Sequence, residues 1–189
     1  MRSTDIPRIA EFWYTILTSP LLQSNPEVVA SCLKVMTVFA VWIEIRIIAN
    51  EKFIDKLFEL VVNNGAPNAF YSPAACECLA AILHKGMEGK LKLELLSHCR
   101  VPERLDVCWS ADRSSLVGDE DFAVSLAKLI NVLMSEVLDA YSELRFPKGS
   151  KPTGAEDFNG IWNRIESMLG YCTFFFQSKS SNISRRFWN

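Results

Sequence analysis

The chain has 189 residues, of which 49% are hydrophobic, with 20 basic and 22 acidic side chains and a formal charge of −2. This composition excludes a disordered chain, because burial of so many apolar side chains can offset the entropy lost on ordering. The balanced charge argues against a domain that binds nucleic acid through a general basic excess. No N-terminal stretch resembles a signal peptide, and Glu44 and Arg46 interrupt the longest apolar runs, so we expect no membrane span.

The hydrophobic pattern predicts helices from the start of the chain. Apolar residues recur at helical spacing from Ile6 to Leu17, and a break follows at Ser19-Pro20. Asn25-Pro26 combines a favoured N-cap residue with proline at the first helical position, and it opens a helix over 27–42. That helix is apolar nearly all round, so we expect neighbouring helices to cover it on both sides.

Similar signals continue through the middle of the chain. Asn50 predicts another N-cap, followed by a helix over 51–62 whose apolar and charged residues separate onto opposite faces. Ser72-Pro73 repeats the combination of cap and proline, and Gly86 is placed to end that helix as its C′ residue. A shorter helix is predicted over 88–99.

Beyond residue 100 the pattern is less regular. Residues 101–118 mix Pro, Asp, Ser and Gly, which predicts an irregular segment. The acids at 119–121 favour the first turn of a long helix, because the helix dipole stabilises negative charge there. A last helix is predicted over 158–176, with an irregular tail over 178–189. We find no convincing strand.

The helix starts recur at a regular interval. The cap-like starts at Pro26, Pro73 and Asp119 are 47 and 46 residues apart. A helix pair at about this period is the signature of a HEAT or armadillo solenoid, in which each pair needs neighbours to bury its apolar faces. We therefore predict an all-α HEAT-repeat solenoid of antiparallel helix pairs, about three to four repeats long, with a simple helical bundle as the alternative. The predicted pairs within the single segment 1–189 are 6–24, 25–64, 72–100 and 119–177.

The histidines and cysteines do not form a pattern typical of a catalytic or metal site. His84 and His98 are the only histidines, and neither has a cysteine at metal-ligand spacing. There is also no glycine-rich phosphate loop. We therefore expect no enzyme activity, no metal and no cofactor. The cysteines fall among apolar residues, which predicts free, buried thiols in a reducing compartment: Cys32, Cys76, Cys78, Cys99, Cys108 and Cys172.

Five lysines form the candidate binding surface. Lys85, Lys90 and Lys92 lie around a predicted turn between two helices, and Lys52 and Lys56 lie on the helix before it. Ammonium groups in this arrangement can contact phosphates, which position a nucleic acid without reading its sequence. Acidic residues alternate with the lysines, so a solvated surface with no ligand is the alternative.

Five segments, in one order, resemble the tRNA exportins of the importin-β (karyopherin) family. They are Trp13-Tyr14-Thr15-Ile16-Leu17, Trp42-Ile43-Glu44-Ile45 with 47–54, Ala74-Ala75-Cys76-Glu77-Cys78-Leu79 with Lys85-Gly86-Met87 and Lys90, Asp121-Phe122 with 128–131, and Ser180-Ser181-Asn182-Ile183. Their order and spacing agree over nearly the whole chain. Departures from the family are Glu44 in place of Asp, Tyr71-Ser72-Pro73 in place of an arginine-containing segment, and the residues after Ile183.

The resemblance implies a HEAT-repeat receptor that binds mature tRNA together with Ran in its GTP form. Such receptors shuttle between nucleus and cytoplasm through the nuclear pore and recognise RNA by its shape and backbone. The second helix of each pair would face the concave side, which makes Lys52, Lys56, Lys90 and Lys92 candidate contacts, with Lys85 beside them. Neither a membrane nor a small-molecule substrate is expected as a partner.

The length of the chain limits this interpretation. Family members are several times longer, so we expect this chain to be a fragment that does not export tRNA alone and whose end repeats expose apolar faces. A HEAT-repeat scaffold that binds only proteins is the alternative function.

Overall fold

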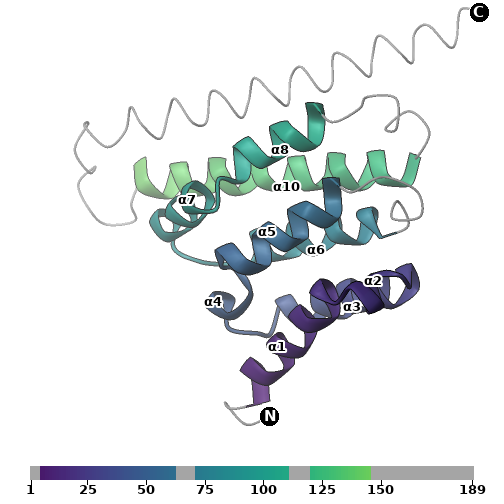
Figure 1. Ribbon diagram of the computed structural model, residues 1–189. Helices are drawn as coiled ribbons and strands as arrows, with labels where there is room; N and C mark the ends of the chain where they lie inside the picture. Colours follow the sequence, from purple (N-terminus) through teal and green to yellow (C-terminus); the bar gives the residue numbers. More distant parts are fainter. Residues whose placement is uncertain (1–4, 63–70, 111–119, 146–189) are drawn as a thin grey trace, which may run out of the picture.

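The computed structural model of the chain describes residues 5–62, 71–110 and 120–145, and all regular elements within these ranges are helices (Figure 1). The predicted helix over 158–176, the tail 178–189 and Cys172 lie outside the described residues. In chain order the helices are α1 (Asp5–Thr18), α2 (Pro20–Gln23), α3 (Pro26–Ala40), α4 (Ile45–Ile48), α5 (Glu51–Val62), α6 (Ser72–His84), α7 (Gly89–His98), α8 (Val101–Ser110) and α10 (Glu120–Arg145).

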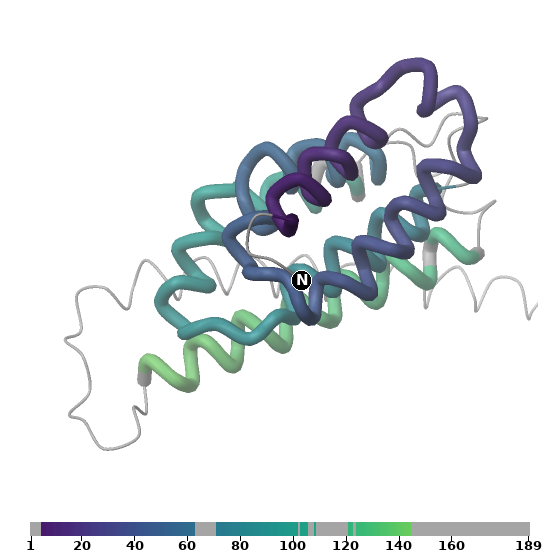
Figure 2. The backbone as a smooth tube through the Cα atoms, turned by 90° about the horizontal axis from the view of Figure 1, so that it is seen from below, coloured from purple at the N-terminus to yellow at the C-terminus, as the bar shows by residue number. Residues whose placement is uncertain are grey.

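The helices stack in successive layers. α6 packs against α3 on one side and α10 on the other, whereas α3 and α10 share no extensive contact. α5 packs on α6 and also contacts α1 and α8. Figure 1 shows α1 and α3 at one end of the stack, α5 and α6 in the middle, and α8 and α10 beyond them, and Figure 2 looks along the same stack from below.

The repeat period agrees with the sequence. The helices of one row, α3, α6 and α10, begin 46 and 48 residues apart, and α1, α5 and α8 begin 46 and 50 residues apart. Layers that contact only their neighbours at a fixed period are the property that separates a solenoid from a closed bundle. The prediction of an all-α HEAT-repeat solenoid is therefore confirmed.

The packing groups the helices differently from the predicted pairs. α3 packs with α1, and α5 packs with α6, whereas α3 and α5 share no extensive contact. The bounds of the predicted pairs, 25–64 and 72–100 among them, therefore stay a prediction. Hydrophobic periodicity identifies each helix, but the choice of partner depends on tertiary packing.

Several predicted helix boundaries are confirmed. Asn25 is the N-cap residue of α3 with Pro26 behind it, although its side chain makes no capping hydrogen bond. Asn50 caps α5, since Phe53 N donates to Asn50 Oδ1 at 3.2 Å. α5 covers the predicted residues 51–62.

Two local predictions are wrong. Residues 101–110 form α8, because Pro102 lies in the first turn, where proline is tolerated. Ser72 is the first residue of α6 after the N-cap Tyr71, and its hydroxyl donates to Leu60 O at 3.1 Å. α6 also ends where predicted, because Lys85 is its C-cap residue and Gly86 follows at C′, although Gly86 does not adopt a left-handed conformation.

The corner between α7 and α8 holds a strained residue. Arg100 has φ 48°, and its carbonyl accepts a hydrogen bond from Arg104 N at 3.1 Å. It occupies the C′ position of α7, after the C-cap residue Cys99. A left-handed residue at C′ is usually glycine, because a side chain with a Cβ is disfavoured there.

We expect Arg100→Gly to stabilise the chain. Removal of the Cβ relieves the left-handed strain, and the greater entropy of glycine in the unfolded chain offsets part of the gain, so the free energy of unfolding should rise by up to about 1 kcal/mol. Urea unfolding measures the change. Arg100→Ala, which keeps the Cβ, is the control. Equal stability of the two variants would contradict the inference that a Cβ at position 100 strains the left-handed backbone.

Candidate functional site

The ammonium group of Lys52 lies on the surface beside an aromatic pair. Lys52 is exposed on the first turn of α5, and its Nζ lies 3.9 Å from the centroid of the Tyr14 ring. The Tyr14 ring in turn meets the Phe53 ring edge-on at 5.4 Å. A cation over an aromatic face is attracted to the ring quadrupole. Lys52 therefore joins α5 to α1 and still presents its charge to solvent.

Lys56 is part of the packed interior. It is one turn beyond Lys52 on α5 and is 8% exposed. Its Nζ lies 2.7 Å from Glu59 Oε1. Its aliphatic stem is covered while the charge reaches an exposed carboxylate, as is usual for a lysine at the edge of a core.

Lys85 binds the end of another helix. Its Nζ donates to Ala40 O and to Val41 O, each at 2.9 Å. These carbonyls belong to the last turn and C-cap of α3, where helix carbonyls lack partners and negative charge of the helix dipole accumulates. Lys85 thus caps a helix 45 residues earlier in the sequence.

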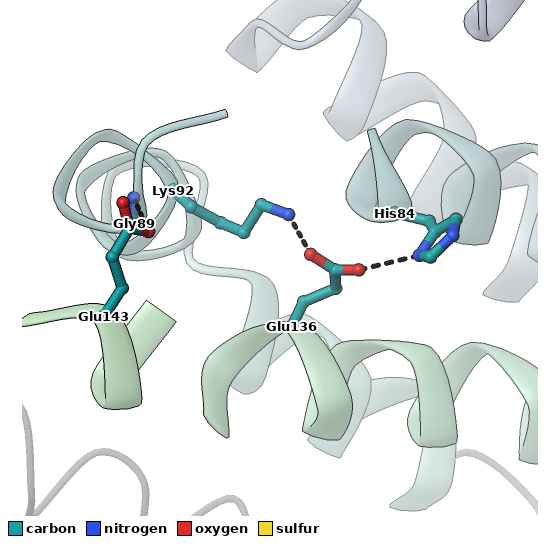
Figure 3. Close-up of polar contacts among 5 residues, drawn as sticks. All are labelled: His84, Gly89, Lys92, Glu136 and Glu143. Carbon is teal, nitrogen blue, oxygen red and sulfur yellow. Dashed lines mark hydrogen bonds and ion pairs between the residues drawn. The ribbon is translucent and has the colours of Figure 1, made fainter. Parts of the chain in front are cut away.

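Lys92 belongs to a buried polar cluster between layers (Figure 3). Lys92 on α7 is 5% exposed, and its Nζ forms an ion pair with Glu136 Oε2 on α10. The other carboxylate oxygen, Oε1, lies 2.7 Å from Nδ1 of His84 at the end of α6. Burial lowers the pKa of Lys92, while the nearby carboxylates of Asp139 and Glu143 act in the opposite direction.

Gly89 lets α7 approach α10 closely. The backbone N of Gly89 donates to Glu143 Oε2 at 2.9 Å, as Figure 3 shows beside the Lys92 cluster. A Cβ at this position would lie 2.8 Å from Glu143 Oε2 and 2.9 Å from Ala140 O. The close approach to α10, and not the backbone conformation of residue 89, therefore requires a glycine here.

Lys90 is the candidate lysine with the fewest constraints. It is exposed in the first turn of α7, and it makes no ion pair or hydrogen bond with any residue in the described ranges. Lys52 and Lys90 therefore present their charges to solvent. Lys56, Lys85 and Lys92 use theirs within the fold.

The residues that organise this region were not predicted from the sequence. Tyr14 and Glu136 come from α1 and α10, far from the lysines in the chain. The sequence held one signal for Glu136, which is its position beside the apolar stripe that includes Leu133 and Val137. In the structure Glu136 is buried. Acids beside a buried stripe are frequently paired with a base, but the partner is not readable from the sequence.

The cysteines fit the prediction of free, buried thiols in the part of the chain that the structure describes. Cys32, Cys76, Cys78, Cys99 and Cys108 are free and buried. Burial raises the pKa of Cys32 to about 11 and those of Cys78 and Cys108 to about 12. Thiols held in the neutral form are poor nucleophiles and poor metal ligands.

Metal-ligand clusters and membrane-spanning helices are absent from the same ranges. Residues 5–62, 71–110 and 120–145 contain no group of three or more His, Cys, Asp or Glu side chains that could hold a metal ion. His98 lies instead 3.9 Å from Glu51. Among the described helices, none is long and apolar enough to cross a membrane.

Comparison with known proteins confirms the resemblance predicted from the sequence. Residues 1–79 match the family described as Exportin 1-like protein. The chain is 29% identical over 184 residues to exportin-T of Mus musculus and of Homo sapiens, which covers 97% of this chain and 18% of each relative. Exportin-T of Arabidopsis thaliana is 32% identical over 144 residues, or 76% of this chain and 14% of the relative. The chain thus spans less than a fifth of the length of these relatives.

We expect Gly89→Ala to destabilise the chain. The added methyl group must displace Glu143 or separate α7 from α10, at a cost on the order of 1–3 kcal/mol. Gly86→Ala is the matched control, because a Cβ at Gly86 meets nothing within 4 Å. The difference between the urea midpoints of the two variants measures the cost of the methyl group added at position 89. Equal midpoints would contradict the close contact between Gly89 and α10.

Glu136→Gln should destabilise the chain more strongly. The substitution leaves the buried ammonium group of Lys92 without its negative partner, and loss of one member of a buried pair costs on the order of 3–5 kcal/mol. The exposed Glu94→Gln on α7 should change the free energy of unfolding by less than about 0.5 kcal/mol. The double variant Lys92→Met with Glu136→Gln should recover part of the loss, since it removes the uncompensated charge. No recovery would contradict this explanation.

Proposed function

We propose that this chain is a segment of a nuclear export receptor for tRNA, which binds tRNA together with Ran-GTP and carries tRNA from nucleus to cytoplasm. The similarity to exportin-T over 97% of the chain carries the proposal. The stacked helical layers support it, because a solenoid offers an extended surface for a large ligand. Exportins are transport receptors, and we propose no catalytic role. As a shuttling receptor, it would also contact components of the nuclear pore.

Lys52 and Lys90 are the residues that we propose for contact with RNA phosphates. Both are exposed, on α5 and α7, and neither charge is neutralised by a carboxylate in the described part of the chain. Phosphate contacts of this kind add affinity without sequence preference, in keeping with recognition of RNA by shape. Lys56, Lys85 and Lys92 remain candidates, but contact with a ligand would require each to give up a hydrogen bond or ion pair, whereas Lys52 would give up only its contact with the Tyr14 ring.

One observation favours the second candidate function, a HEAT-repeat scaffold that binds only proteins. Three of the five candidate lysines stabilise the fold itself. If Lys52 and Lys90 are solvated surface residues that bind no ligand, this segment has no basic patch for RNA. Pull-down with tRNA and Ran-GTP, compared with Ran-GDP, separates the two functions.

We expect the isolated chain to bind tRNA weakly and with a steep dependence on salt. A short stack cannot enclose a tRNA, so its affinity should come from phosphate contacts alone. Fluorescence anisotropy of labelled mature tRNA, with and without Ran-GTP, measures this. Lys52→Glu and Lys90→Glu should each weaken binding and reduce the salt slope by about one unit.

Lys34→Glu is the control for charge, because Lys34 is an exposed lysine on α3 that is not proposed to contact RNA. An equal effect of all three substitutions would contradict a specific role for Lys52 and Lys90. Tight ternary binding to the isolated chain at physiological salt would show that the segment suffices, contrary to the proposal.

A further inference from the structure

α7 is attached to its neighbours with little apolar burial. Its buried residues are Gly89, Lys92 and Leu96, so one large apolar side chain anchors the helix. By comparison, α5 buries a whole apolar face: Phe53, Ile54, Leu57, Phe58, Leu60 and Val61. Apolar burial is the main favourable term in helix packing, and segments with few such contacts open locally at low cost. The position of α7 therefore depends on its polar contacts.

Two polar contacts hold α7 to α10. In Figures 1 and 2, α7 lies beside the C-terminal half of α10. Gly89 N donates to Glu143 Oε2 at 2.9 Å, and Lys92 Nζ forms its ion pair with Glu136 Oε2 (Figure 3). Asp139 lies between these two acids in the sequence. Residues 136, 139 and 143 follow one another at steps of three and four, so their carboxylates share one face of α10, called here the acidic row.

The acidic row faces the basic side of α7. Burial lowers the pKa of Lys92, and the nearby carboxylates of Asp139 and Glu143 oppose that shift. The segment 89–100 has more Lys and Arg than acidic side chains: Lys90, Lys92 and Arg100 against Glu94. Carboxylate and phosphate oxygens both bind an ammonium group through charge-assisted hydrogen bonds. The acidic row therefore occupies the place that a row of phosphates would take on this side of α7.

We propose that the acidic row is an autoinhibitory contact, in which α10 holds Lys92 until RNA phosphates replace the carboxylates. The inference rests on the proposed binding of tRNA and adds Lys92 to the phosphate contacts through a movement of α7. The exposed Lys90, in the first turn of α7, brings phosphates close to this contact. Glu136 keeps a partner when Lys92 leaves, because His84 Nδ1 lies 2.7 Å from its Oε1.

The backbone at both ends of α7 permits this movement. α6 ends at Lys85, whose ψ of 131° turns the chain into extended backbone, and a Cβ at Gly86 would meet nothing within 4 Å. At the other end, Arg100 has the left-handed φ of 48°. A few residues at the ends of elements absorb the change of backbone angles in most hinge motions. α7 can therefore turn away from α10 while α6 and α8 stay packed.

Hydrogen exchange of the full chain without RNA tests whether α7 detaches. Amides of α7 should exchange at least about tenfold faster than those of α6, because few apolar contacts oppose its opening. The double variant Asp139→Asn with Glu143→Gln keeps the acceptor oxygens and removes two charges. It should speed exchange in α7 about threefold or more and leave α6 unchanged. Equal protection of α6 and α7 would overturn the inference, whether or not the chain binds RNA.

Fluorescence anisotropy with labelled tRNA tests the autoinhibition. The double variant should bind tRNA about three- to tenfold more tightly than the original chain at low salt. Its salt slope should increase by about one unit, because Lys92 then contacts a phosphate as well. The control, Glu11→Gln with Glu77→Gln, removes the same charge from exposed positions on α1 and α6. It should raise the affinity less than about twofold and leave the salt slope unchanged.

The outcomes separate this inference from the proposed function. Equal affinities and salt slopes of the double variant and the control would overturn the autoinhibition and leave tRNA binding in place. Absence of tRNA binding in every variant would contradict the proposed function, and with it the release of Lys92 by RNA, even if α7 exchanges fast. A gain in binding of Ran-GTP alone, with no gain for tRNA, would assign the released α7 to a protein partner and overturn the assignment to RNA.

Discussion

The packing of α6 is the constraint on which the rest of the structure depends. α3, α5 and α10 surround this helix, and only Glu77 and His84 among its residues are exposed. Small side chains allow three helices to approach it together: Ala74, Ala75, Cys76 and Cys78 are all buried. A larger residue at one of these positions would separate two layers, so the helix that joins the repeats is also the one least tolerant of change.

Polar contacts then fix the layers relative to one another. Lys85, just after α6, caps α3 in the layer before it, and Glu136 on α10 joins the end of α6 to α7. Apolar packing is non-directional, whereas an ion pair or a capped carbonyl requires a defined distance. These contacts therefore specify how each layer sits on the next, although a buried ion pair adds little net stability compared with apolar packing.

The same contacts determine which charges remain for a ligand. A chain with a charge of −2 has few basic groups to spare, and three of its candidate lysines hold the layers or their helices together. Lys52 and Lys90 thus carry the proposed contribution to RNA binding.

The sequence by itself determined the class of fold, the extent of most helices and the resemblance to exportins. Apolar periodicity and the caps at Asn25 and Asn50 are local, and local signals survive in any tertiary context. The mixed Pro, Asp, Ser and Gly content of residues 101–118 predicts an irregular segment where α8 forms, although proline is tolerated in a first turn. Only the tertiary structure decided the helix partners, the burial of Lys56 and Lys92 and the exposure of Val35 and Val38 on α3. A lysine at helical spacing has the same local pattern whether its partner is water or a carboxylate 44 residues away, and only folding brings that partner within reach.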